Sequence, residues 1–455
     1  MTAELIISDL DDHAVRRGHN RAAGDTLSIV AGIVGGLAVG AGIAATWGTW
    51  ATPGGAATAT GTITALAGTY LCLVAMVLSS RLPWLEREVG QDRLIGWHRK
   101  VGPWALILIV AHFVLTGLGY AQAAGVSLWD EIVTLVTTYP WMVPATLALA
   151  IMIFLGLTAI PAVRRLVAYE TWWASHLYFY LAVVLAFGHQ LTSGTLFSSH
   201  ELLRVVWISL YVVVAAIIVW SRIGLPLLRS WRHDLRIDRV VREGDDLVSV
   251  YISGRNLARL GAQGGQFFSW RFLTRHWWWQ AHPYSLSAGA NGSWLRITVK
   301  NLGDQSGALT QLRPGTRVVA EGPYGVFTAG ARRTPRIVAF AAGVGITPIR
   351  ALLDDVPPSV DVTVVYRVAS TDEDSIAMRD ELEEIVSRRG WKLIYLPGPR
   401  SAYALSVDYL TSLVPQLVSS DVYVCGPQSF ADAIRSAARI AGVPPRRVHY
   451  EAFAF

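Results

Sequence analysis

Charged residues are unevenly distributed along the 455-residue chain, and their absence from long stretches of the first half predicts its helices. Five stretches contain no Asp, Glu, Lys or Arg: Thr26–Ser80, Val101–Trp129, Ile132–Val163, Thr171–His200 and Val205–Ser221. A helix needs about 20 apolar residues to cross a bilayer, and the first stretch is long enough for two helices, divided near Pro53. The pattern therefore predicts six spans near Thr26–Thr46, Thr60–Leu78, Trp97–Tyr120, Met142–Ile160, Trp172–His189 and Leu203–Arg222.

Beyond Trp231 the pattern changes to short alternating segments separated by Gly and Pro. Four segments are typical of strands in an antiparallel barrel: Leu247–Ile252, Gln266–Phe272, Trp294–Val299 and Arg317–Glu321. From Pro335, apolar strands alternate with helical stretches, which favours a parallel sheet with crossover helices. The expected strands there are Arg336–Ala341, Val362–Tyr366, Lys392–Leu396 and Val422–Val424, and the expected helices are Pro348–Asp354 and Ser375–Arg388.

The fold class is therefore a multidomain membrane protein. We expect an N-terminal segment over residues 1–25, a six-helix transmembrane bundle over 26–224, an antiparallel β-barrel domain over 232–330 and an α/β domain with a parallel sheet over 335–455. The composition agrees, because 52% of the residues are apolar and only 16% are charged, against about 25% charged in a typical soluble domain. It excludes a disordered, collagen-like or disulfide-stapled protein.

The charges in the short loops predict how the chain is oriented in the membrane. Arg and Lys gather before the first span, in the second and fourth loops and after the sixth span, whereas the other loops carry mainly Asp130, Glu131 and Glu201. By the positive-inside rule, we expect a multi-pass plasma-membrane protein, in contact with membrane lipid, with both termini in the cytoplasm. The net charge of +6 includes no run of five basic residues, so no nucleic acid partner is expected. The pattern gives no evidence of an obligatory protein partner.

Four of the eleven histidines lie in or at the ends of two predicted spans. His98 and His112 are on the third span, and His176 and His189 are on the fifth. Polar side chains inside a membrane are costly and usually functional, and neutral imidazole is a common axial ligand of haem iron. Because both spans run outward, the four side chains form one pair near the cytoplasmic side and one nearer the outside. The alternative is isolated histidines that only make hydrogen bonds.

The spacing tests this interpretation. Fourteen residues rotate an ideal helix by about 1400°, which leaves His98 and His112 on one face. The thirteen residues from His176 to His189 leave those side chains about 140° apart. We therefore predict a π-bulge or another irregularity in the fifth span.

Two motifs in the predicted barrel suit a flavin. In the first, an aromatic ring beside a hydroxyl can pack on the isoalloxazine edge and donate a hydrogen bond to ribityl or phosphate oxygen. In the second, a strand leads into a turn and a helix start whose backbone N–H groups can hold a pyrophosphate. Alone, the first motif is better explained as an ordinary barrel strand. The predicted FAD-binding residues are His282, Pro283, Tyr284, Ser285, Thr298, Lys300 and Ser306.

A nucleotide motif follows in the α/β region, where an apolar strand ends in glycines and Pro348 is expected at the first helical position. Glycines let a dinucleotide approach the backbone, and the helix N-terminus favours its phosphates. Arg367 follows the next strand, where an arginine can meet a 2′-phosphate; this favours NADPH and leaves NADH possible, and an ordinary salt-bridged arginine is the alternative. The predicted nucleotide-binding residues are Gly343, Gly345, Thr347, Pro348, Arg367, Ser370, Gly426 and Pro427.

Cys425 and Phe455 are the candidate catalytic residues. A terminal aromatic ring can cover the flavin where nicotinamide must stack, so Phe455 would move aside for hydride transfer. The alternative is a buried residue of a terminal strand.

With these motifs, the chain resembles the NADPH oxidase/ferric reductase family from about residue 60 to residue 455. The resemblance implies a six-helix, two-haem membrane domain fused to a ferredoxin-reductase-like flavin and nicotinamide module. It also implies that the four histidines bind two b-type haems, that the barrel binds FAD, and that Cys425 lies at the nucleotide. Superoxide-producing members usually carry a further histidine one turn beyond the outer ligand on the third span, where this chain has Thr116.

We therefore expect a transmembrane oxidoreductase that moves electrons from cytoplasmic NADPH through FAD and haem to an acceptor outside. Motif similarity favours oxygen, giving superoxide. Thr116 weakens that reading and leaves a ferric or cupric chelate as the alternative, although the outer loops contain no clustered Asp, Glu and His. From another class, a non-enzymatic haem-binding sensor or relay subunit is disfavoured by the fused flavin and nucleotide motifs.

Overall fold

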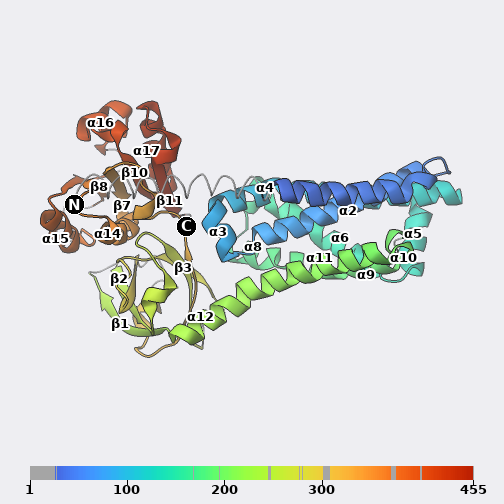
Figure 1. Cartoon of the computed structure of the whole chain (residues 1–455), viewed down its shortest axis with the longest axis horizontal. Helices are drawn as coiled ribbons and strands as arrows, with labels where there is room; N and C mark the ends of the chain where they lie inside the picture. Colours follow the sequence, from blue (N-terminus) through green and yellow to red (C-terminus); the bar gives the residue numbers. More distant parts are fainter. Residues whose placement is uncertain are drawn as a thin grey trace. The chain divides into compact units, whose positions relative to one another are not determined.

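The computed structural model describes residues 26, 28–167, 169–193, 195–243, 247–275, 277–278, 280–300, 308–369, 376–399 and 402–453. The chain divides into two compact units, with the boundary between Ser221 and Arg222. The first unit is helical and the second contains the sheets (Figure 1). The boundary is close to residue 224, where the sequence predicts the end of the transmembrane domain.

Apolar helices dominate the first unit. The described residues include five helices long and apolar enough to span a membrane: Ser28–Thr49, Gly55–Leu78, Arg93–Ala124, Met142–Ala159 and Glu201–His233. The remaining predicted span forms two consecutive helices, α8 (Tyr169–His176) and α9 (Tyr178–Thr192), separated at Leu177. This break confirms the expected irregularity between the two histidines, although it is not a π-bulge. A π-helical segment is present elsewhere, at Trp220–Gly224.

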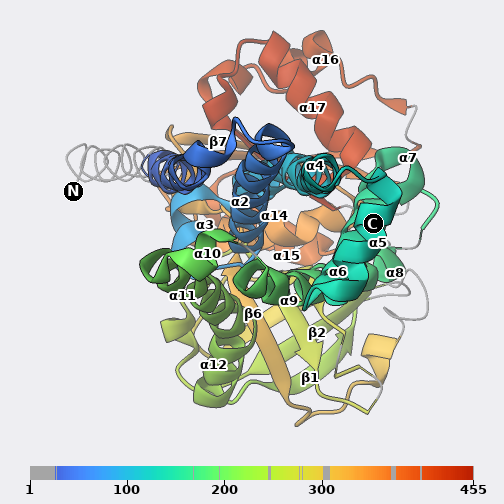
Figure 2. The same cartoon turned by 90° about the vertical axis from the view of Figure 1, so that its right-hand side faces the viewer.

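The long helices pack in pairs. Within the bundle, α2 (Gly55–Leu78) runs along α4 (Gln91–Ala124), and α6 (Met142–Ala159) runs along α9 (Figure 2). Small residues allow the close approach of α2 to α4, because a Cβ atom on Gly61 would lie 2.5 Å from Oγ1 of Thr116. The other helices of the unit are α3 (Pro83–Val89), α5 (Leu128–Thr138), α7 (Pro161–Arg164), α10 (Thr195–Ser199) and α11 (Glu201–Val219).

The second unit begins with α12 (Leu225–His233) and two antiparallel sheets. One sheet has the order β1 (Arg236–Arg242), β2 (Leu247–Ser253), β5 (Trp294–Lys300), and the other has the order β4 (His282–Ser285), β3 (Phe267–Phe272), β6 (Val318–Tyr324). Alternate residues of β2 and β5 point into one apolar core, as the period of two predicts. The opposite face carries Ser249, Tyr251, Arg296 and Thr298.

A five-stranded parallel sheet completes the unit and confirms the predicted α/β arrangement. Its order is β11 (Val448–Phe453), β10 (Asp421–Pro427), β7 (Arg336–Ala342), β8 (Asp361–Val368), β9 (Lys392–Pro397). Both faces are covered, which explains the nearly continuous apolar run in β7. Helices α14 (Ile346–Asp355) and α15 (Arg379–Arg389) pack on one face, and α16 (Val407–Leu413) and α17 (Gln428–Ile440) on the other.

Candidate functional site

Four histidines form two facing pairs in the helical unit. His98 and His112 lie on α4, while His176 ends α8 and His189 lies on α9. The ring centres of His98 and His176 are 6.2 Å apart, and those of His112 and His189 are 6.4 Å apart. The break at Leu177 separates the two helices and lets both of their imidazoles face α4. The structure therefore brings together the pairs that the sequence predicts.

Backbone carbonyls of α2 hold the two imidazoles of α4. Nδ1 of His98 lies 2.9 Å from the carbonyl oxygen of Ala75, and Nδ1 of His112 lies 2.9 Å from that of Gly61. A carbonyl oxygen can only accept, so Nδ1 must carry the proton in both rings. The opposite nitrogen, Nε2, is then unprotonated and able to bind a metal ion.

The partner imidazoles are held differently. Nδ1 of His176 and Nδ1 of His189 are buried and make no hydrogen bond with normal geometry to the residues that the structure describes. The ring of His176 instead stacks on Trp172, with 5.2 Å between ring centres, and on Phe179, with 6.5 Å. In the first pair, a hydrogen-bonded imidazole thus faces one that packs on aromatic rings.

The spacing within each pair suits one metal ion between two imidazoles. Two metal–nitrogen bonds of about 2 Å, with roughly 1.2 Å more from each nitrogen to its ring centre, separate the centres by about 6.4 Å. Among the described residues, no group of three or more His, Cys, Asp or Glu side chains is placed to hold a metal ion. Such a metal would need further ligands from a macrocycle, and the two axial imidazoles of a haem fit this donor set.

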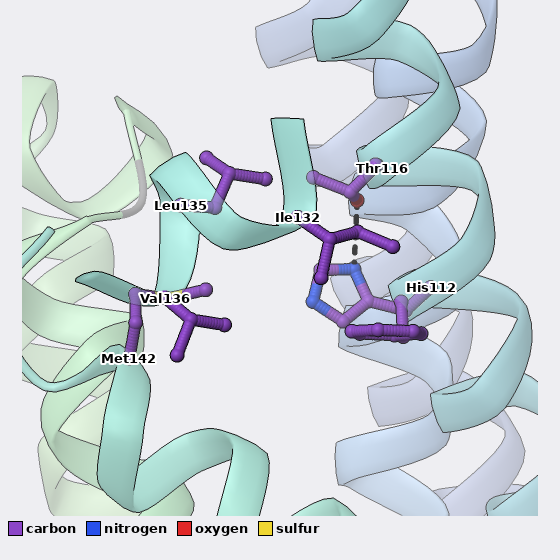
Figure 3. Close-up of a pocket in the computed structure, with 8 residues that line it drawn as sticks. His112, Thr116, Ile132, Leu135, Val136 and Met142 are labelled. Carbon is purple, nitrogen blue, oxygen red and sulfur yellow. Dashed lines mark hydrogen bonds between the residues drawn. The ribbon is translucent and has the colours of Figure 1, made fainter. Parts of the chain in front are cut away.

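A small cavity of about 50 Å³ adjoins His112. Figure 3 shows His112 and Thr116 of α4 on one side, Ile132, Leu135 and Val136 of α5 on another, and Met142 at the start of α6. The Thr116 hydroxyl lies 3.1 Å from Nδ1 of His112. Apart from these two side chains the wall is apolar, which suits contact with a porphyrin edge.

The flavin motif forms strand β4, which pairs antiparallel with β3. Ser285 lies opposite Phe267 at one end of the pairing, and His282 lies opposite Trp270 at the other. The rings of His282 and Tyr284 stack almost in parallel, with 5.9 Å between their centres. Burial lowers the pKa of His282 and raises the pKa of Tyr284 to about 12, so both rings are uncharged at neutral pH. Nε2 of His282 and Oε1 of Gln280 are buried and have no hydrogen-bond partner among the described residues. Orphaned polar atoms of this kind fit a site completed by a polar ligand.

The other predicted FAD residues are less closely grouped. Thr298 is buried and its hydroxyl is bonded to Ser249, at 2.8 Å, and Ser287, at 2.7 Å, so it is engaged inside the protein. Lys300 is exposed at the end of β5. Pro283 is exposed on β4, and Ser306 lies outside the described residues.

The predicted nucleotide residues converge at the carboxyl ends of β7, β8 and β10. Gly343 has a φ of +56°, and its carbonyl accepts a hydrogen bond from the Tyr366 hydroxyl. A Cβ atom on Gly345 would lie 2.3 Å from the carbonyl oxygen of Cys425, so the turn after β7 touches the end of β10. Arg367 pairs in register with Ala342 at the same edge. This is where ligands bind in open α/β sheets.

Two details of this region differ from expectation. Helix α14 begins at Ile346, so Pro348 is its third residue and not its first, and both Thr347 and Pro348 are buried. Cys425 is fully buried in the core, and burial raises the pKa of its thiol well above the ordinary value. A thiol in this position is protonated at neutral pH. Gly426 and Pro427 follow it at the end of β10, and Ser370 and Phe455 lie outside the described residues.

The sequence did not identify the groups that support these sites. The carbonyls of Gly61 and Ala75 have no side-chain signature, although Gly61 is one of several small residues in α2 that signal close helix packing. Trp172, four residues before His176, has the spacing at which helical side chains meet. That spacing is the signal that could have found it.

Comparison with known proteins covers both units. Residues 64–187 match the family described as ferric reductase like transmembrane component, and residues 340–436 match the oxidoreductase NAD-binding domain. A flavohemoprotein of Chromobacterium violaceum is 28% identical over 246 residues, which are 49% of this chain and 61% of that protein. The ferredoxin reductase component of a 3-ketosteroid-9-alpha-monooxygenase from Rhodococcus rhodochrous is 27% identical over 226 residues, which are 48% of this chain and 64% of that protein. The chain thus spans less than two thirds of these relatives.

Among solved structures, the flavohem-like FAD/NAD binding domain of a nitric oxide dioxygenase from Vibrio cholerae is similar, with 22% identity and a TM-score of 0.39. The match covers 48% of this chain and 98% of that domain.

The family matches define the class of protein: a membrane-associated, NAD(P)H-dependent oxidoreductase with a flavin and nucleotide reductase module. The chain thus joins a region similar to a ferric-reductase-like transmembrane component to a region similar to an oxidoreductase NAD-binding domain, which is the arrangement expected from its resemblance to the NADPH oxidase/ferric reductase family.

Proposed function

We propose that this chain carries electrons across the plasma membrane, from cytoplasmic NADPH through FAD and two b-type haems to an acceptor on the outer side. The proposal rests on two pairs of facing imidazoles. The ring centres are 6.2 Å apart in the first pair and 6.4 Å apart in the second. His98 and His176 would hold one haem, and His112 and His189 the other. When bound, these groups and the flavin supply the electron-transfer chemistry, while the protein positions them.

The residues of the bundle hold the ligands in a defined state. Ala75 and Gly61 accept the Nδ1 protons of His98 and His112, which keeps Nε2 of each ring available. The wall beside His112 is mainly apolar, with Thr116 as its other polar side chain. Both termini face the cytoplasm in this proposal, because the basic loops lie on that side.

In the soluble unit, FAD would bind along β4 through Tyr284 and Ser285, and NADPH would bind at the turn after β7. The left-handed backbone of Gly343 lets the dinucleotide come close, and the start of α14 directs N–H groups at its phosphates. Arg367 at the same edge favours NADPH through its 2′-phosphate, with NADH as the alternative. Roles for Ser306, Ser370, Lys300, Cys425 and Phe455 stay predictions.

Oxygen is the acceptor that we favour. The cavity beside His112 is small and its wall is mainly apolar, which suits a small apolar molecule better than a charged metal chelate. The described residues also contain no acidic cluster that would hold a chelated metal. A ferric or cupric chelate is the second candidate, because Thr116 stands where superoxide-producing relatives usually have a histidine.

Two measurements test the proposal. An absorbance spectrum of the extracted protein, oxidised and then reduced with dithionite, should reveal flavin and two low-spin haems. Cytochrome c reduction driven by NADPH should be sensitive to superoxide dismutase. Rates on a ferric chelate that are unaffected by removing oxygen would reject oxygen in favour of the chelate. Haem without FAD, and no NADPH oxidation, would instead indicate a non-enzymatic sensor or relay.

A further inference from the structure

A cluster of charged side chains, of which one is buried and two are partly buried, joins the antiparallel sheets to the parallel-sheet domain. Arg296 on β5 is only 4% exposed, and its guanidinium meets both carboxylate oxygens of Glu381 on α15, at 2.6 Å and 2.8 Å. Arg350 on α14 donates to the same carboxylate, at 2.6 Å. One carboxylate thus bridges two arginines that belong to different domains.

The arginine also holds the end of the flavin motif. Nε of Arg296 donates to the Ser287 hydroxyl at 3.1 Å, and another of its nitrogens donates to the Ser287 carbonyl at 2.8 Å. The Ser287 hydroxyl in turn accepts from Thr298. Ser287 is two residues beyond Ser285, the last residue of β4. The charge cluster is therefore connected directly to the strand on which FAD is expected.

On the other side, the cluster fixes α14, the helix that begins at the nucleotide turn. Arg350 lies one turn into this helix and also pairs with Asp354. The carboxylates of Asp354 and Asp355 accept the backbone N–H groups of Gly289, at 2.8 Å, and Gly264, at 2.6 Å. The approach is close, because a Cβ atom on Gly264 would lie 1.9 Å from the Ala351 carbonyl oxygen. Three connections thus attach α14 to the antiparallel sheets.

We propose that Arg296, Glu381 and Arg350 form a positioning clamp that sets the geometry of hydride transfer, by fixing the nucleotide helix α14 against the flavin strand β4. The clamp residues are positioning residues and do not take part in the chemistry. This inference rests on the proposed function, since it requires that NADPH reduce a bound flavin.

The charges on the clamp are suited to this task. Burial raises the pKa of Glu381, but its hydrogen bonds and ion pairs with Arg296 and Arg350 outweigh burial and lower the pKa below the ordinary value. The carboxylate therefore stays ionised at neutral pH. Hydrogen bonds between ionised groups in a bidentate geometry are stronger and more directional than neutral ones.

The test is anaerobic, single-turnover reduction of the flavin in the full-length protein by NADPH and by NADPH deuterated at the transferred position. Glu381→Gln keeps the shape of the side chain and removes its charge. We expect its limiting rate to fall about ten- to a hundredfold, since misplacement by about 1 Å can cost roughly a hundredfold, with unchanged FAD content and NADPH half-saturation. The deuterium isotope effect on that rate should be fully expressed.

The same helix offers a matched control. Glu383 is 46% exposed and bonds Arg379 at 2.8 Å on the outer side of α15, so Glu383→Gln should leave the limiting rate unchanged. If the groups act as one clamp, the double variant Arg296→Gln/Glu381→Gln should be no slower than the slower single variant. Should Glu381→Gln fail to fold, Arg350→Gln keeps the Arg296–Glu381 pair and should still slow hydride transfer, by about tenfold.

A wild-type limiting rate in Glu381→Gln, or a loss explained by missing FAD or weaker NADPH binding, would overturn the clamp and leave the proposed function intact. A wild-type protein that does not reduce its flavin with NADPH would overturn both.

Discussion

In the helical bundle the candidate ligands are side chains spaced along neighbouring helices, whereas in the soluble unit the candidate contacts come from strand ends, turns and a cluster of ion pairs. His98 and His112 are separated by four turns of α4 and face partners at similar distances. Arg296 and Glu381 are 85 residues apart in sequence and meet only through the tertiary fold. The bundle thus positions its groups by helix geometry, and the soluble unit positions its groups by contacts between domains.

Removing one imidazole should have the largest effect, because it should abolish electron transfer through the bundle and leave the activity of the soluble unit unchanged. In His112→Ala we expect about half of the haem absorbance to be lost, because one axial ligand of one pair is missing. Reduction of the external acceptor should fall to background, while NADPH-driven reduction of a soluble dye continues at the wild-type rate. Absorbance spectra and the two assays measure this.

His200→Ala is the control, since Nδ1 of His200 contacts the backbone carbonyl of Leu196 near the same end of the bundle. Loss of dye reduction in His112→Ala would mean that the soluble unit does not work independently of the bundle.

A second variant tests the backbone contact behind the same histidine. A Cβ atom on Gly61 would lie 2.5 Å from the Thr116 hydroxyl, so Gly61→Ala should push α2 away from α4 and weaken the hydrogen bond to His112. Loss of such a supporting contact costs about 10–100-fold in metal affinity. Haem retention during dilution in detergent measures the effect.

Gly96→Ala on α4 is the matched control, because no described atom beyond its chain neighbours and its own helix backbone lies within 4 Å of its Cβ position. Equal haem retention in the two variants would mean that the hydrogen bond to the Gly61 carbonyl does not support haem binding.

The rate of maleimide labelling tests how closely a buried cysteine of the soluble unit is packed. Cys72 in α2 and Cys425 in β10 are both buried. Because burial raises the pKa of Cys425, its thiolate is scarce at pH 8 and becomes more abundant as the pH rises; each pH unit below the pKa reduces the thiolate about tenfold. We expect maleimide labelling of Cys425 in the native protein to be at least roughly tenfold slower than in denaturant. Rapid labelling at pH 8, seen by mass spectrometry, would show that β10 opens.

The smallest effect is spectroscopic. The imidazole planes are 75° apart for His98 and His176 but 26° apart for His112 and His189. Near-perpendicular axial rings give a more anisotropic low-spin EPR signal than near-parallel rings. We therefore expect two distinct signals, of which His112→Ala removes the less anisotropic one. Two identical signals would mean that the ring orientations are equal in the loaded protein.

The sequence predicted the histidine pairs because helix geometry is local: a separation of fourteen residues determines which face a side chain occupies. It also predicted the break in the fifth span, since thirteen residues do not return to the same face. The glycine turn after β7 was predictable for a similar reason, because an apolar strand, two glycines and a helix follow one another directly.

The remaining features depend on contacts between distant segments. The role of Thr298 inside the protein follows from Ser249 and Ser287, which belong to other segments. The start of α14 at Ile346 and the burial of Cys425 are likewise set by packing across the sheet. No local pattern identifies Glu381 as the partner of Arg296 among the many charged residues of the soluble unit.

The interruption at Leu177 makes the orientation of each imidazole on that side adjustable by itself. A substitution that turns the short helix before the break changes the tilt of His176 and leaves His189 where it is, whereas on the unbroken opposite helix any rotation is shared by both rings. Reorienting one imidazole of the four by mutation is therefore easiest in the eight residues that end at His176.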